Sequence, residues 1–153
     1  MGIEPSHAII NTTDTDRSLA FYATVFGAVV ESDHTFAQPA LDALYGVEGV
    51  TIRSVFFNAG GYRLHTVETV FPKVAAPDRP HLEPGARIPG LNGLSFKVDD
   101  VEALARLADD NGFPREEIVT FVLSRTEEMS LFFMEDPDGV RLEFCQSKPR
   151  APR

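Results

Sequence analysis

The sequence predicts an α+β fold of two tandem βαβββ modules that form a curved mixed β-sheet around a central cavity. Three observations indicate this fold. An apolar strand, an acidic turn and a helix occur twice in that order, a β-hairpin closes each half, and a proline-rich stretch separates the halves. The 153 residues are enough for a single domain of this kind. Within residues 1–153 we therefore expect a first module over 5–69, a connecting arm over 70–90 and a second module over 91–147.

Each half begins with a strand and a helix. The first strands are predicted at Ala8–Ile10 and Leu94–Val98, which are short and apolar. Acidic residues follow both strands and are suited to cap a helix N-terminus. The helices are predicted over residues 17–26 and 101–111, where apolar side chains recur at core-facing spacing, and a glycine directly follows each helix.

A further short helix, or a lid, is expected within residues 38–50 of the first half. Leu41, Leu44 and Tyr45 recur there at helical spacing. An apolar stripe of this kind usually packs against the rest of the fold, so we expect packing rather than a pocket lining.

Each half ends in a predicted hairpin, over residues 54–65 and 130–143. Both contain a β-rich strand, a glycine-containing turn and a second strand. Setting the two segments side by side matches Phe56 with Phe132 and gives the second turn two extra residues.

The alignment of the two halves brings chemically informative residues to equivalent positions. His65 and Glu143 fall at the same place on the two final strands, and His7 falls opposite Gly93 at the start of the two first strands. If the two sheets curve toward one another, these positions converge on one cavity. Three of the four carry imidazole or carboxylate groups, which suit a divalent metal.

The connecting arm is predicted from its composition. Residues 70–90 hold five of the eleven prolines, and proline has no N–H to donate to a β-ladder.

Composition and charge exclude several classes of function. A formal charge of −9 with scattered arginines disfavours nucleic acid as a partner. No apolar run approaches the roughly 20 residues that span a bilayer, and the first residues do not resemble a secretory signal, so we expect a cytoplasmic protein without membrane association. The single cysteine, Cys145, excludes an intrachain disulfide and a cysteine-based zinc cluster.

Four segments carry specific motifs: residues 6–10, 16–22, 96–101 and 136–144. Together they resemble the vicinal oxygen chelate superfamily, which includes glyoxalase I, methylmalonyl-CoA epimerase, extradiol dioxygenases and the bleomycin- and fosfomycin-resistance proteins. The resemblance covers about residues 6–146 and implies the glyoxalase/bleomycin resistance/dioxygenase fold. The superfamily supports several chemistries, so the resemblance indicates the fold more strongly than the reaction.

The resemblance implies a set of metal ligands. The family takes its ligands from the first and last strand of each module, which here gives His7, His65 and Glu143. The position usually held by a third histidine is Gly93, so the site either binds a divalent metal ion (Zn, Ni, Co, Mn or Fe) with three protein groups or contains no metal. His34 and His81 are the remaining imidazoles of the chain.

A bound divalent cation would act as a Lewis acid on two neighbouring substrate oxygens and stabilise the charge that develops when a carbon-bound proton is removed. Glu143 is the best candidate for the base that takes this proton. Tyr62 and Glu68 are weaker candidates, and strand alternation directs Glu68 away from the face that carries His65.

Three functions remain open at this point. The first is a glyoxalase-like, metal-dependent lyase or isomerase that acts on a small oxygen-rich metabolite. The second is a metal-free protein of the bleomycin-resistance type that binds a small molecule, which Gly93 favours. The third is an Fe(II)-dependent dioxygenase, for which two histidines and a carboxylate are a suitable ligand set. The resemblance also implies a homodimer.

Overall fold

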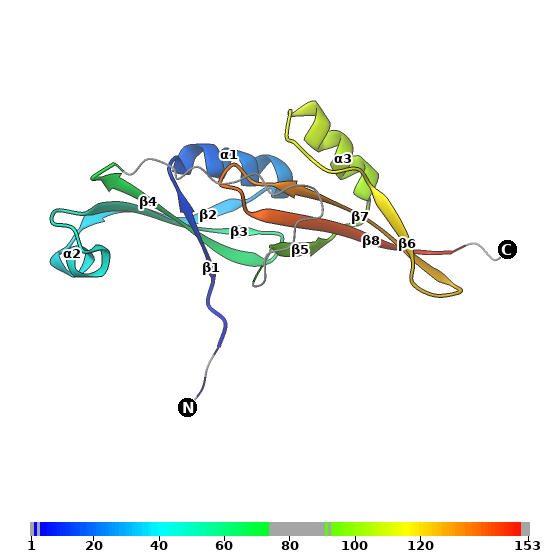
Figure 1. Cartoon of the computed structure of the whole chain (residues 1–153), viewed down its shortest axis with the longest axis horizontal. Helices are drawn as coiled ribbons and strands as arrows, with labels where there is room; N and C mark the ends of the chain where they lie inside the picture. Colours follow the sequence, from blue (N-terminus) through cyan, green and yellow to red (C-terminus); the bar gives the residue numbers. More distant parts are fainter. Residues whose placement is uncertain (1, 3, 74–90, 92, 151–153) are drawn as a thin grey trace. The chain divides into compact units, whose positions relative to one another are not determined.

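The computed structural model of the chain describes residues 2, 4–73, 91 and 93–150. The chain separates into two compact units, residues 1–87 and 88–153, and each unit carries one four-stranded mixed sheet (Figure 1). The prediction of an α+β fold with two tandem βαβββ modules is confirmed.

In the first module, the sheet has the strand order β1-β4-β3-β2, with β1 parallel to β4 and the other pairs antiparallel. An additional short helix follows β2. Its elements are β1 (Ala8–Thr12), α1 (Thr15–Phe26), β2 (Val29–Ala37), α2 (Pro39–Tyr45), β3 (Thr51–Ala59) and β4 (Tyr62–Phe71).

The second module repeats this arrangement. Its sheet has the order β5-β8-β7-β6, so the first strand again lies parallel to the last. Its elements are β5 (Leu94–Lys97), α3 (Val101–Asp110), β6 (Val119–Val122), β7 (Glu127–Glu135) and β8 (Arg141–Pro149). None of the helices in the described parts of either module is long and apolar enough to cross a membrane.

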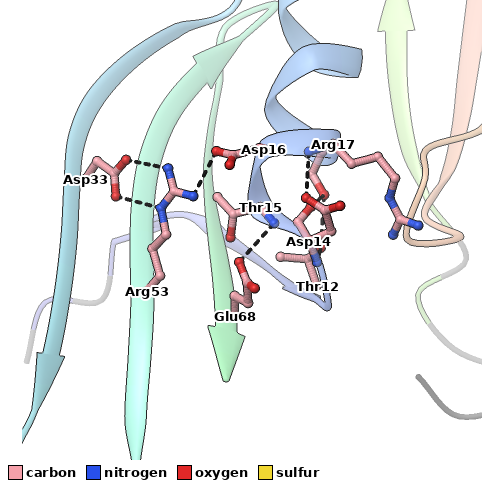
Figure 2. Close-up of polar contacts among 9 residues, drawn as sticks. Thr12, Asp14, Thr15, Asp16, Arg17, Asp33, Arg53 and Glu68 are labelled. Carbon is pink, nitrogen blue, oxygen red and sulfur yellow. Dashed lines mark hydrogen bonds and ion pairs between the residues drawn. The ribbon is translucent and has the colours of Figure 1, made fainter. Parts of the chain in front are cut away.

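Helix α1 begins at Thr15, two residues before the predicted start. The Asp14 carboxylate accepts a hydrogen bond from the backbone N–H of Arg17 at 3.0 Å and so caps the helix (Figure 2). The N–H of Thr15 donates to Glu68 Oε2 at 3.0 Å, which links the first helical turn to β4. The helix ends at Phe26 as predicted, because Gly27 adopts the left-handed conformation with φ 62°.

The packing of α1 defines the two faces of the first sheet. Tyr22 is fully buried, and its ring centroid lies 5.0 Å from that of Phe57 on β3. Leu64 and Thr66 on β4 are also fully buried, whereas the alternate residue His65 is only half-buried. Since successive side chains of a strand point to opposite faces, His65 and the residues that share its face point away from α1.

An ion-pair cluster on the α1 side connects three elements. The Arg53 guanidinium donates to both Asp33 oxygens, through Nε at 3.0 Å and Nη2 at 2.7 Å, and through Nη1 to Asp16 at 2.8 Å (Figure 2). The hydrogen bond from Arg53 lowers the pKa of Asp33 below its usual range. Arg53 therefore has a structural role that joins β2, β3 and α1.

Two expectations about connecting segments had different outcomes. The short helix is confirmed as α2, but its predicted packing is wrong for Leu44, whose side chain is 77% exposed. Strand β4 extends to Phe71, into the first residues of the predicted arm. Residues 74–90 of the arm, including His81, lie outside the described residues.

Both predicted hairpins are present. The strand register shifts the match between the two hairpins by one residue relative to the sequence alignment. On β3 the residue opposite His65 is Phe56, and on β7 the residue opposite Glu143 is Phe133 rather than Phe132. The register therefore matches Phe56 with Phe133. This register leaves one extra residue in the second turn, where the alignment had two.

Helix α3 covers most of its predicted range and packs on the second sheet. The Asp100 carboxylate caps its first turn by accepting from the N–H of Ala103 at 2.9 Å. Leu142 and Phe144 on β8 are buried, so Glu143 between them points to the face away from α3.

Candidate functional site

Two histidines meet on the face of the first sheet away from α1. His7 directly precedes β1, which runs parallel to β4. Ile9, two residues after His7, lies opposite His65. The ring centroids of His7 and His65 are 5.1 Å apart. Phe56 stacks on His65 with a centroid distance of 4.0 Å and an interplanar angle of 7°, and it lies 5.0 Å from His7. The three rings therefore form one aromatic cluster.

Each histidine uses one ring nitrogen in a hydrogen bond with a serine. His65 Nε2 lies 2.7 Å from Ser54 Oγ, and His7 Nδ1 lies 2.8 Å from Ser6 Oγ. His65 Nδ1 is buried and has no hydrogen-bond partner among the described residues. A buried imidazole nitrogen without a partner carries a desolvation cost unless a ligand or an ion meets it.

The surroundings of His65 favour its neutral form. Burial is the largest cause that lowers the pKa of His65 below the usual 6.5, and the nearby His7 and Arg63 add to the effect. Neutral imidazole is the form that binds a metal ion, so the environment of this ring suits a ligand.

The separation of the two rings also fits a shared metal. With metal–nitrogen bonds of about 2.1 Å and a tetrahedral angle, two imidazole centroids on one ion lie about 5 Å apart. The 5.1 Å between His7 and His65 agrees with this geometry. Within the described residues, no group of three histidine, cysteine or acidic side chains gathers that could hold a metal ion, and His34 on β2 does not join the pair.

Glu143 occupies the equivalent position in the second module. It lies on β8 opposite Ser95 and Phe133, and Ser95 Oγ donates to Glu143 Oε1 at 2.7 Å. This hydrogen bond orients the carboxylate. Each module is described by itself, so the grouping of Glu143 with His7 and His65 stays a prediction.

In each module, the sequence reasoning missed an arginine next to the candidate ligand. Arg63 lies two residues before His65, and its guanidinium carbon is 4.5 Å from the Phe56 centroid. Arg141 lies two residues before Glu143, and its guanidinium carbon is 4.0 Å from the Phe133 centroid. The signal was present in the sequence, because the alignment of the final strands already matches the two arginines.

Gly93 has a steric explanation. A Cβ at this position would overlap the backbone carbonyl of Arg141 on β8, whose carbonyl carbon would be only 3.0 Å away. A contact this close to backbone atoms cannot be relieved by rotating a side chain. The strand backbone therefore leaves no room for a histidine at position 93, where the resemblance implied a third ligand.

Two weaker base candidates have other surroundings. Glu68 lies on the α1 side of β4 and accepts the hydrogen bond from Thr15, as the strand alternation predicted. Tyr62 is 41% exposed at the start of β4, next to the hairpin turn.

The family of the chain follows from its match over almost the full length. Residues 5–144 match the profile of the Glyoxalase/Bleomycin resistance protein/Dioxygenase superfamily. The chain belongs to this superfamily. The resemblance that the sequence motifs indicated is thereby confirmed.

Solved structures of other superfamily members share the fold. A glyoxalase family protein from Bacillus cereus has 13% sequence identity and a TM-score of 0.74, and the match covers 96% of this chain and 95% of that protein. A glyoxalase family protein from Enterococcus faecalis has 23% identity and a TM-score of 0.61, with coverage of 93% and 96%.

The fosfomycin resistance protein FosX from Listeria monocytogenes, in a structure complexed with Mn(II) and sulfate, has 14% identity and a TM-score of 0.60. The match covers 95% of this chain and 93% of FosX. No sequence among curated proteins is similar enough to count as a relative. At these identities the solved structures support the superfamily fold and leave the reaction of this chain to its own residues.

Proposed function

We propose that the chain is a glyoxalase-like, metal-dependent lyase or isomerase that acts on a small oxygen-rich metabolite by proton transfer. The observation that carries this proposal is the His7–His65 pair, whose centroid separation of 5.1 Å suits a shared ion. A superfamily member, FosX, has been crystallised with Mn(II), which is consistent with a divalent metal in this fold.

In this proposal His7, His65 and Glu143 hold the divalent cation. The bound cation would act as a Lewis acid on two neighbouring oxygens of the substrate. Phe56 fixes the plane of the His65 ring by stacking, and Ser54 holds its Nε2. Ser95 holds one oxygen of Glu143, while the other oxygen has no hydrogen-bond partner within the described part of the second module. That second oxygen is the acceptor we assign to the substrate proton.

The test is hydrogen–deuterium exchange at carbon, measured by proton NMR in D2O without oxygen. The purified protein is supplied with Ni, Co, Mn or Zn and offered a panel of 2-oxo and 2-hydroxy compounds. We expect metal-dependent exchange in at least one compound and its loss in Glu143→Gln, which keeps the side-chain shape but removes both the base and an anionic metal ligand. Exchange that survives Glu143→Gln would contradict the assignment of the base.

A second candidate function is the binding of a small molecule without metal. The steric exclusion of a ligand from position 93 favours it, because the superfamily's usual third histidine has no place in this backbone. A ligand that still binds after exhaustive chelation, and equally well to Glu143→Gln, would support this function over the lyase or isomerase. In either case we propose a small-molecule ligand and a homodimer as the functional partners.

A further inference from the structure

Arg63 extends the aromatic cluster of the first module with a cation. It lies on β4 two residues before His65 and therefore on the same face of the strand. Its guanidinium contacts Phe56, which in turn stacks on His65. The arginine, the phenylalanine and the histidine form one continuous surface on the face away from α1.

Two contacts hold the Arg63 guanidinium in place and leave two of its nitrogens available to a ligand. Arg63 Nε donates to Glu31 Oε2 at 2.7 Å, and the aromatic contact supports the plane of the group. Its Nη1 and Nη2 have no hydrogen-bond partner among the residues that the structure describes, and the side chain is 46% exposed. A guanidinium fixed in this way loses little conformational entropy when it binds a carboxylate through two parallel hydrogen bonds.

The same arrangement recurs beside Glu143. Arg141 contacts Phe133, and its Nη2 donates to Glu116 at 2.9 Å. Exposed ion pairs contribute little to stability, so stability alone does not explain why both modules have this arrangement next to a candidate ligand. Arg53 provides the contrast, because it lies on the α1 side and donates through three nitrogens to two carboxylates.

We propose that Arg63 binds the negative charge of the substrate, which makes the substrate a small carboxylate with a second oxygen on the neighbouring carbon. This inference rests on the proposed function, since it concerns the same site. Arg63 would bind the carboxylate through Nη1 and Nη2, and Glu31 would act as a positioning residue that keeps the guanidinium against Phe56.

Glycolate and glycolamide test the proposal, because both carry two vicinal oxygens and differ in charge. Their affinities for the zinc-loaded protein are measured by NMR titration, and the ratio of the two affinities is the readout. We expect Arg63→Gln to lower the preference for glycolate about tenfold, since hydrogen bonds between charged groups are the strong ones. Arg63→Lys keeps the charge without the planar fork and should give an intermediate ratio.

Arg106→Gln is the matched control, because it makes the same change in net charge at an exposed position of α3. It should leave the ratio unchanged. An unaltered ratio in Arg63→Gln, or an equal fall in Arg106→Gln, would overturn the proposal. Zinc binding is measured separately by calorimetry: absence of zinc binding contradicts the proposed metal site, and the titrations repeated on metal-free protein then decide the role of Arg63 independently.

Discussion

At the scale of single residues, backbone geometry explains why a glycine stands at position 93, where the superfamily usually has a histidine. Strand β8 passes so close at Arg141 that a Cβ at position 93 would overlap its carbonyl group. The close approach of the backbones at Gly93 and Arg141 therefore requires glycine at position 93. A larger side chain cannot be accommodated here without moving the strands apart.

We predict that Gly93→Ala destabilises the protein by about 1–3 kcal/mol, the usual cost of forcing extra atoms into a packed region. Urea unfolding followed by circular dichroism measures this change. Gly2→Ala is the control, since a Cβ there meets nothing within 4 Å. Equal stabilities of the two variants would show that β8 has room at Gly93.

His65 should titrate below its usual pKa of 6.5 in the metal-free protein, because burial disfavours the imidazolium. The unfolded chain then binds the proton more readily than the folded chain. The contribution of His65 to stability is therefore fully present above about pH 6.5 and falls as the pH decreases. NMR titration of the ring protons measures the midpoint, and a value at or above 6.5 would contradict the buried environment.

At the scale of elements, the contact between Glu68 and the start of α1 explains an acidic residue that the sequence left ambiguous. Glu68 accepts from the N–H of Thr15, one of the helical N–H groups that lack a partner within the helix. We predict that Glu68→Ala costs about 1–2 kcal/mol of stability and that Glu68→Gln costs less, since its amide oxygen can still accept.

Urea unfolding measures both Glu68 variants, and metal content serves as the second readout. Both variants should bind as much metal as the wild type, because Glu68 lies on the α1 side of the sheet. Unchanged stability together with lost metal would instead place Glu68 in the site.

The sequence predicted the order of strands and helices because apolar spacing and capping residues are local signals. It predicted the start of α1 two residues late, since Thr15 and Asp16 resemble turn residues, and the Glu68 partner of Thr15 lies 53 positions away. The one-residue error in the second hairpin has a similar cause. Register depends on how many residues the turn between Glu135 and Arg141 uses, which composition does not determine.

At the scale of the whole molecule, the duplication is what made candidate residues visible in the sequence. It matched His65 with Glu143, and the structure gives both residues a phenylalanine opposite and an arginine two positions before. The ring stacking, the serine hydrogen bonds and the steric reason for Gly93 depend on neighbouring strands. These features could not be predicted from one strand at a time.

We propose that His7, His65 and Glu143 hold one divalent metal ion. The most direct test is the metal content of tag-free protein, measured by elemental mass spectrometry after incubation with Zn, Ni, Mn or anaerobic Fe(II) and removal of unbound metal. His7→Ala, His65→Ala and Glu143→Gln are handled identically, with His34→Ala as the control histidine. We predict close to one metal per chain in the wild type and in His34→Ala, and a marked loss in the other three variants. A wild-type protein that retains no metal, or variants that retain it fully, would rule out this metal site.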